Sequence, residues 1–232
     1  HRIARIAIAA LASVGMLASV AACGSGQSTS EKNGTIEVAA SVNQWGTVAK
    51  ALGGDNVNVT SIINSTNVDA HDYEPTTSDI AKLQKAQVII VNGAGYDAWA
   101  VKAAQTANAI IVNAAEIGGV NDGENPHVWF SADVRKAVAQ AITEAYEQAD
   151  AAKKNDFDKM NDQWAAEENN VESKIAEVKQ KTDGLAYAAT ESVASYLAED
   201  MGLADATPSG YARATANESE PTPTDIKQFT DA

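Results

Sequence analysis

The sequence predicts an α/β protein with two parallel-sheet lobes joined by a single long helix. Short apolar runs alternate with helical stretches between Thr35 and Phe130, and this alternation is typical of a parallel sheet covered by helices. From Ala132 to about Lys181 the chain then contains neither proline nor glycine. After Gly184 an apolar run and a helical stretch follow again, so each lobe is expected to be Rossmann-like.

The strands expected in the first lobe are rich in Val and Ile and lie at 35–41, 57–63, 88–91 and 110–112. The helices expected between them lie at 44–52, at 77–85 and near 97–107. Thr76 or Thr77 is expected to cap the second of these helices, with Asp79 in its first turn.

The stretch without glycine or proline is expected to form two helices, at 132–149 and 155–181. The second would extend about 40 Å at 1.5 Å per residue. Its apolar residues Val171, Ile175 and Val178 are spaced by four and three positions, which predicts one buried stripe. The pattern favours a connector between lobes over a coiled coil, because no heptad repeat is sustained.

The second lobe is expected to be either truncated or abnormal. A strand at 185–190 and a helix at 191–201 follow the connector, and another helix is expected from Thr224. About 50 residues are too few for a complete α/β layer. The expected organisation is a signal peptide over 1–22, a lipidated cysteine and tether over 23–33, a first lobe over 34–153, a linker helix over 154–182 and a partial second lobe over 183–232.

The N-terminal segment has the layout of a secretory signal. Arg2 and Arg5 precede an apolar run from Ile6 to Ala22, and small residues stand directly before Cys23. The setting of Cys23 resembles a bacterial lipobox, in which the thiol is lipidated; the alternative is a free cysteine beside an ordinary cleavage site. We therefore expect a lipid anchor on the extracellular face of the bacterial cell membrane. With no second cysteine in the sequence, an intramolecular disulfide cannot form.

The chain is acidic, with a formal charge of −14 from 17 basic and 31 acidic residues. The sequence has no basic stripe, which argues against nucleic acid as a partner. An acidic surface mildly concentrates cations, but many exported proteins are acidic for solubility, so charge alone is weak evidence of function.

Outside the signal the sequence has two histidines, and they stand in similar loops. His71 lies in Asp-Ala-His-Asp-Tyr-Glu-Pro and His127 in Glu-Asn-Pro-His-Val-Trp-Phe, so a proline and an aromatic residue accompany each. Each loop follows an expected strand, where the carboxyl ends of a parallel sheet open into a ligand crevice. A single loop histidine is usually only a solvated polar residue, whereas two in matching loops favour a joint site.

The two loops resemble the signature loops of the zinc/manganese-type metal-binding solute-binding lipoproteins of ABC importers. The matching residues are His71, Tyr73, Glu74, Pro75, Ser78 and Asp79 in the first loop, and Asn125, Pro126, His127 and Trp129 in the second. An Asn-Gly-x-Gly segment at 92–95 and the following Trp99 match as well. The resemblance runs from about Thr35 to the C-terminus. It departs from the family at Ser131 and Ala132, where Asp-Pro is usual.

The resemblance implies His71 and His127 as metal ligands and a third ligand from the second lobe. In the family this third ligand follows the lobe's first strand, and the matching segment Thr-Glu-Ser-Val-Ala-Ser-Tyr-Leu places Glu191 there. Without the resemblance, Glu191 would be interpreted as a first-turn glutamate favoured by the helix dipole. The family's fourth ligand, an aspartate, has no counterpart in this sequence.

The implied ligand set indicates which metal to expect. Two imidazoles with a carboxylate form a nitrogen–oxygen site without sulfur, which suits Mn²⁺, Fe²⁺ or Zn²⁺. A carboxylate in place of a third imidazole shifts the preference toward harder ions, and the histidine-rich loop of many zinc members is absent from 116–124. We therefore expect Mn²⁺ in preference to Zn²⁺.

The function implied by the resemblance is extracellular capture of the metal by a monomer and delivery to the membrane permease of an ABC importer, without catalysis. Two other classes stay open at this point. A metal-dependent hydrolase would use His71, His127 and Glu191 and leave a fourth position for water. A surface adhesin, a label that some family members carry, would bind a host partner even after chelation of the metal.

The segment Gly-Ala-Gly-Tyr-Asp-Ala at 93–98 matches the Gly-x-Gly-x-x-Ala pattern of dinucleotide sites and follows an expected strand. However, two strands precede it, and Tyr96 would crowd the turn that a phosphate must approach. We interpret this segment as a strand-to-helix turn packed by Trp99.

Overall fold

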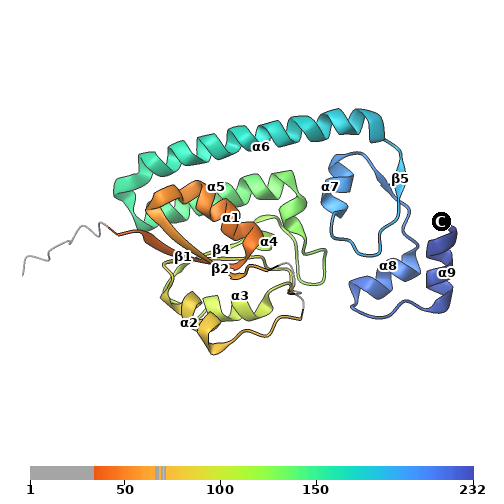
Figure 1. Cartoon of the computed structure of the whole chain (residues 1–232), viewed down its shortest axis with the longest axis horizontal. Coiled ribbons are helices and arrows are strands. Elements are labelled where there is room, and N and C mark those ends of the chain that lie inside the picture. Colours follow the sequence, from red (N-terminus) through yellow and green to blue (C-terminus); the bar gives the residue numbers. More distant parts are fainter. Residues whose placement is uncertain (1–33, 66–67, 69, 71) are drawn as a thin grey trace, which may run out of the picture. The chain divides into compact units, whose positions relative to one another are not determined.

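A computed structural model describes residues 34–65, 68, 70 and 72–232. The expected signal peptide, Cys23 and the tether lie outside the described residues, and so does His71. From residue 34 onward the chain folds as one unit. It has the expected α/β architecture, with a parallel sheet, a long helix and a smaller region after it (Figure 1).

Among the described residues, the larger sheet has four parallel strands in the order β2-β1-β3-β4. They are β1 (Ile36–Val42), β2 (Val57–Ile63), β3 (Val88–Val91) and β4 (Ile110–Asn113). The two central strands, β1 and β3, are mostly buried because helices cover both faces. The strand order reverses between β1 and β3, and the carboxyl ends of strands at such a switch point are where ligands bind in these folds.

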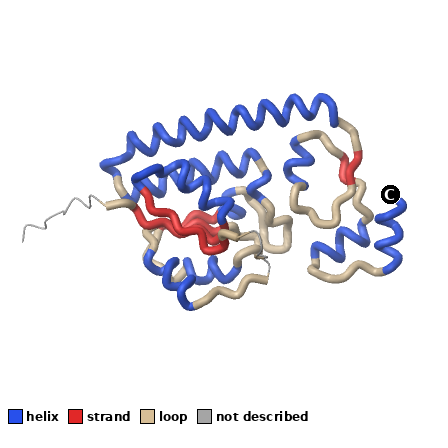
Figure 2. Tube along the Cα trace, in the orientation of Figure 1, coloured by secondary structure: helices blue, strands red, loops and turns tan. Residues whose placement is uncertain are grey.

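Helices pack on both faces of this sheet (Figure 2). They are α1 (Asn43–Gly53) and α5 (Ala132–Ala149) on one face, and α2 (Thr77–Lys85) and α3 (Ala98–Ala104) on the other. The core under α1 and α5 buries Trp45, Tyr146 and Phe157, and the Tyr146 hydroxyl donates to the carbonyl of Ala49 at 2.9 Å. Leu83 of α2 packs into a second core on the opposite face.

The long helix α6 (Lys154–Thr182) has 29 residues and follows α5 after a 3₁₀ turn at Ala151–Lys153. It packs on α1 and α5. The prediction of a buried stripe on this helix is wrong, since Val171 and Val178 are 48% and 39% exposed. Phe157 and Glu168 are the buried residues of α6, so the helix is covered mainly in its first half, while Val171 and Val178 face solvent and Ile175 is partly buried. No helix within the described ranges is long and apolar enough to cross a bilayer.

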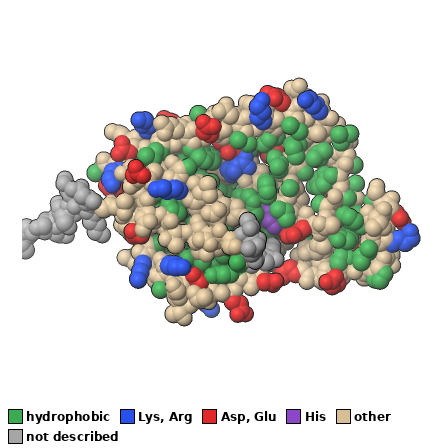
Figure 3. Space-filling view, viewed as in Figure 1, with side chains coloured by type: hydrophobic (Ala, Val, Ile, Leu, Met, Phe, Trp, Pro, Cys, Tyr) green, Lys and Arg blue, Asp and Glu red, His purple; other side chains and the backbone are tan. Residues whose placement is uncertain are grey.

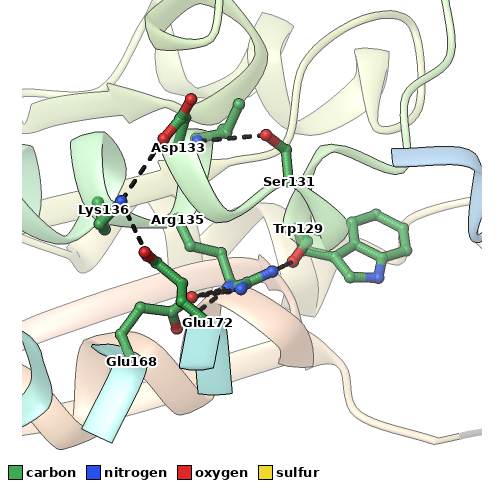
Figure 4. Close-up of polar contacts among 8 residues, drawn as sticks. Trp129, Ser131, Asp133, Arg135, Lys136, Glu168 and Glu172 are labelled. Atoms are coloured by element: carbon green, nitrogen blue, oxygen red, sulfur yellow. Dashed lines mark hydrogen bonds and ion pairs between the residues drawn. The ribbon is translucent and has the colours of Figure 1, made fainter. Parts of the chain in front are cut away.

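An ion-pair network ties α5 to α6 (Figure 4). The Nε of Arg135 donates to both carboxylate oxygens of Glu168, at 3.0 and 3.1 Å, and its Nη1 donates to the carbonyl of Trp129 at 3.0 Å. The side chains of Arg135 and Glu168 are only 15% and 7% exposed. Nearby, Lys136 pairs with Glu172 at 2.8 Å, but these side chains are 42% and 33% exposed. Because Trp129 follows the candidate histidine loop, the buried pair also anchors that loop.

The second lobe differs most from the prediction. The strand expected at 185–190 is only β5 (Ala186–Tyr187), because the strand beside it, β6 (Ala204–Asp205), offers two residues for pairing. The helix expected at 191–201 begins later, as α7 (Ser195–Asp200). α8 (Ser209–Ala216) has no counterpart in the sequence prediction, and α9 (Pro223–Asp231) begins one residue before the expected Thr224.

The second lobe has little core of its own. Between residues 183 and 232, all of which the structure describes, Ala198 is the single buried residue. Leu185 and Ile226 are 55% and 48% exposed. Packing within this lobe therefore contributes little to its stability.

Candidate metal site

The candidate ligand His127 lies in the loop between α4 (Ala114–Ile117) and α5, where its side chain is 6% exposed. Tyr96 and Trp129 face the imidazole edge-on, with ring centroids 5.8 and 5.3 Å away. These two aromatic rings also meet each other edge-on at 5.3 Å. The imidazole is therefore held between aromatic walls that limit its rotation.

Asn125 fixes the tautomer of His127. The backbone N–H of His127 donates to Asn125 Oδ1 at 3.2 Å, and Asn125 Nδ2 donates to the carbonyl of Ser192 at 2.9 Å. Because a backbone N–H can only donate and a carbonyl can only accept, these two contacts determine which end of the amide is the oxygen. That oxygen lies 2.6 Å from His127 Nδ1. Nδ1 therefore carries the proton, and Nε2 of the neutral imidazole keeps a lone pair for a metal.

Glu191 faces this second nitrogen. Its Oε1 lies 3.7 Å from His127 Nε2. Two ligands bound at about 2.1 Å to one tetrahedral ion lie about 3.4 Å apart, so the observed spacing is close to that of a shared ion. Glu191 precedes α7 by several residues and belongs to a loop. Its interpretation as a first-turn glutamate favoured by the helix dipole is therefore wrong.

Two of the three predicted ligands are thus brought together, and the third, His71, lies outside the described residues. In the described part of the chain no group of three or more His, Cys, Asp or Glu side chains is placed to hold a metal ion. The imidazole nitrogen and the carboxylate oxygen are donors that suit Mn²⁺, Fe²⁺ and Zn²⁺.

The loop after β2, in which His71 occurs, is fastened at its end by Asp79 of α2. The Tyr73 hydroxyl donates to Asp79 Oδ2 at 2.7 Å, and the Tyr73 ring lies 5.3 Å from that of Trp99. The backbone N–H and hydroxyl of Thr76 donate to the same carboxylate oxygen, at 2.9 and 2.6 Å. Together with the Asp79 N–H, which donates to Thr76 Oγ1 at 3.2 Å, the Thr76 contacts form the capping box of α2, so that Thr76, one of the two predicted residues, is the cap.

The same contacts shift two pKa values. The hydrogen bond from the Thr76 hydroxyl, with others from Tyr73, the Thr76 backbone and Lys82, holds the pKa of Asp79 well below its ordinary value, against the opposing effect of burial. Burial and the Asp79 carboxylate raise the pKa of Tyr73 to about 12. The hydrogen bonds that Tyr73 and Thr76 donate to Asp79 are therefore strongest when Asp79 is ionised and Tyr73 is neutral.

We expect Asp79→Asn to remove an acid-labile part of the stability. Because the pKa of Asp79 is lower in the folded chain than in the unfolded one, its stabilising effect is complete above about pH 5 and is lost as the pH falls toward the folded-state pKa. The variant should lose about 1 kcal/mol of the free energy of unfolding at pH 7, as for other helix caps. Urea unfolding at several pH values should show the parent approaching the variant between about pH 5 and 3. Parallel pH profiles would contradict this role of Asp79.

The turn after β3 is built around a buried carboxylate. Asp97 accepts the backbone N–H groups of Asn92 and Gly93 at 2.7 and 2.8 Å, and burial raises its pKa despite these hydrogen bonds. A phosphate would need such N–H groups, and here Asp97 occupies them, which supports the interpretation of 93–98 as a turn. Asn92 connects this turn to the site, since its Nδ2 donates to the Pro126 carbonyl and its Oδ1 accepts from Trp45 Nε1, both at 2.9 Å.

The contacts of Asn92, Asn125 and Tyr196 were not predicted from the sequence. The Tyr196 hydroxyl donates to the Asn125 carbonyl at 2.8 Å across 71 positions of sequence. Burial raises the pKa of Tyr196, and the carboxylates of Glu124 and Glu199 add to this effect. A signal existed for Asn125, because asparagine often accepts a backbone N–H two residues on. None existed for Tyr196, whose contact depends on the tertiary fold.

Charged side chains of both signs are spread over the surface. On the face in Figure 3, Lys and Arg side chains are interspersed with Asp and Glu side chains. With 31 acidic and 17 basic residues in the sequence, the protein as a whole attracts cations weakly rather than anions.

Known proteins of metal transport are similar to this chain. The high-affinity zinc uptake system protein ZnuA of Bacillus subtilis (strain 168) is 24% identical over 208 residues, which cover 79% of this chain and 65% of the relative. The manganese ABC transporter substrate-binding lipoprotein PsaA of Streptococcus pneumoniae is 25% identical over 162 residues, which cover 63% of this chain and 52% of the relative. The chain thus spans between about half and two thirds of the length of these two curated relatives.

A solved structure confirms the fold class. The metal-dependent lipoprotein YcdH from Bacillus subtilis matches with a TM-score of 0.71 at 22% identity, over 85% of this chain and 74% of that structure. A family model described as the zinc-uptake complex component A, periplasmic, matches residues 38–232, which include most of the sheet, α6, His127 and Glu191. The chain therefore belongs to the family of zinc-uptake complex component A periplasmic proteins.

Proposed function

We propose that this chain captures a divalent transition metal and delivers it to the membrane permease of an ABC importer. The observation that carries the proposal is the 3.7 Å approach of His127 Nε2 to Glu191 Oε1. An imidazole of fixed tautomer beside a carboxylate of the other lobe has the donors and the spacing of a metal site. The two relatives named for zinc uptake and for manganese transport support the transport role.

We propose His71, His127 and Glu191 as the protein ligands. A carboxylate rather than a third imidazole favours Mn²⁺ over Zn²⁺ as the transported ion, with Fe²⁺ as a third candidate. By the Irving–Williams order Zn²⁺ can still bind more tightly in vitro, so metal supply would decide which ion is loaded in the cell.

The remaining parts of the proposal concern where the chain works. A lipid on Cys23 would hold the monomer at the extracellular face of the cell membrane, with 23–33 as its tether, near the permease. The first lobe (34–153) would contribute both histidines and the second lobe (183–232) would contribute Glu191, with 154–182 between them. We propose no catalytic role, since the named relatives are transport proteins.

Equilibrium titration of the full chain with Mn²⁺ and Zn²⁺ tests this function. We expect one ion per chain, no hydrolysis of ester or phosphoester substrates, and an affinity more than about 100-fold lower in Glu191→Ala, because loss of a ligand exceeds the effect of an outer-shell partner. Glu199→Ala is the matched control, because Glu199 is an exposed glutamate on α7 of the same lobe, and it should bind like the parent. Equal binding by Glu191→Ala would remove this residue from the site, and a parent that binds neither ion would overturn the function.

A further inference from the structure

We propose that Asn125 is a latch that couples the orientation of His127 to the position of the Glu191 loop, so that the metal enters a site already assembled across the two lobes. The latch consists of Asn125 and its hydrogen bonds to His127, Ser192 and Tyr196. This inference rests on the proposed function and deepens it, because it assigns a positioning role to residues that are not themselves ligands.

The polar groups of Asn125 are divided between the two lobes. Its Oδ1 accepts the backbone N–H of His127 at 3.2 Å and lies 2.6 Å from Nδ1 of the same residue. Its Nδ2 donates to the carbonyl of Ser192 at 2.9 Å. Its backbone carbonyl accepts the Tyr196 hydroxyl at 2.8 Å. The first two contacts hold the backbone and the imidazole of His127, and the last two hold the loop and helix that follow the second-lobe ligand Glu191.

The two ends of the Asn125 amide are coupled because the group is planar and rigid. Oδ1 and Nδ2 move together, so a rotation of the Asn125 side chain that breaks the contact with Ser192 also withdraws the acceptor from His127. Ser192 is the neighbour of Glu191 in the chain, so the carbonyl that the amide holds lies beside the residue whose carboxylate faces Nε2 at 3.7 Å. The orientation of the two candidate ligands is therefore linked through one side chain.

The first-lobe end of the latch is held by a hydrogen bond from a buried residue. The carbonyl of Pro126, between Asn125 and His127, accepts from Asn92, which is fully buried at the end of β3. The second-lobe end rests on Tyr196 in α7, whose ring packs against the first-lobe core. All donors and acceptors of the latch belong to the chain, so these bonds can form before metal arrives. When the two loops are ordered beforehand, metal binding carries a smaller entropic cost of ordering them.

Three substitutions separate the latch from the ligands. Asn125→Asp keeps an oxygen for His127 but has no N–H for the carbonyl of Ser192. Tyr196→Phe removes the hydroxyl of the second lobe and leaves the amide intact. Ser192→Ala is the matched control, because the latch uses only the backbone carbonyl of Ser192.

The readouts are hydrogen exchange of the full chain without metal, its affinity for Mn²⁺, and the imidazole nitrogen shifts of His127. We expect Asn125→Asp and Tyr196→Phe to speed amide exchange in 188–196 by about 5- to 10-fold and to weaken Mn²⁺ binding by about 10-fold. Both should keep the Nδ1–H tautomer of His127. A fourth variant, Asn125→Ala, lacks the oxygen that accepts from Nδ1 and should lose this tautomer. Ser192→Ala should match the parent in all three measurements.

The outcomes separate this inference from the function on which it rests. Parent-like exchange and affinity in both Asn125→Asp and Tyr196→Phe would overturn the latch, even if the parent binds Mn²⁺ as expected. Faster exchange in both variants, in a parent that binds no metal, would support the link between the two loops and overturn the metal-capture function. Faster exchange with unchanged Mn²⁺ affinity would overturn the assignment of the latch to metal binding.

Discussion

His127→Ala should lower the affinity of the chain for both Mn²⁺ and Zn²⁺ by more than about 100-fold, because loss of a ligand exceeds the effect typical of an outer-shell partner. His127 is the buried member of the described ligand pair, and its Nε2 is the atom that faces Glu191. Removal of the imidazole takes one nitrogen donor from the proposed ligand set. Competition against a fluorescent chelator, with each metal in turn, measures the loss.

Two further variants show whether this loss comes from the nitrogen or from packing. His127→Phe keeps an aromatic ring between Tyr96 and Trp129 but provides no metal donor, so it should lose metal binding as fully as His127→Ala. Asn121→Ala alters an exposed residue of the same loop and should bind like the parent. Normal binding by His127→Phe would exclude His127 as a ligand.

Glu168→Ala should lower the free energy of unfolding by about 3–5 kcal/mol, because it leaves the guanidinium of Arg135 buried without its carboxylate. The matched control is Glu172→Ala, one helical turn away on α6, whose partner Lys136 is 42% exposed. Removal of this more exposed pair should cost at most about 1 kcal/mol. Guanidinium unfolding followed by circular dichroism measures both losses.

The double variant Arg135→Met/Glu168→Met tests the cause of the larger loss. If the loss comes from an unpaired buried charge, replacement of both partners by apolar side chains should restore most of the stability. Equal losses in Glu168→Ala and Glu172→Ala would contradict the distinction between the buried and the exposed pair.

The first lobe was largely predictable because its signals are local. The elements at 57–63, 77–85, 88–91 and 132–149 have the predicted bounds, since runs of Val and Ile and a Thr–Asp cap are readable in the sequence. The second lobe was less predictable because its elements depend on contacts between segments and on weak local signals. The length of β5 depends on what β6 offers for pairing, and α8 contains Gly210 and Thr215, which are weak helix formers.

The site was predictable as a set of residue types but not as a geometry. Motif resemblance selected His127 and Glu191, and the structure brings their side chains together. Their role as ligands stays a prediction, as does that of His71. The tautomer of His127 and the contact of Tyr196 with Asn125 depend on which loops meet in space, and no spacing within either loop encodes that meeting.

The thin core of the second lobe has a consequence for the lifetime of the protein. A lobe with Ala198 as its single buried residue gains little stability from its own packing. An ion that bridges the two lobes would therefore act as a folding ligand, and at 100 times its dissociation constant it would add about 2.7 kcal/mol. Proteases cut segments that open locally, so they would degrade empty chains faster than loaded ones. The surviving population would then be enriched in chains that hold a metal ion.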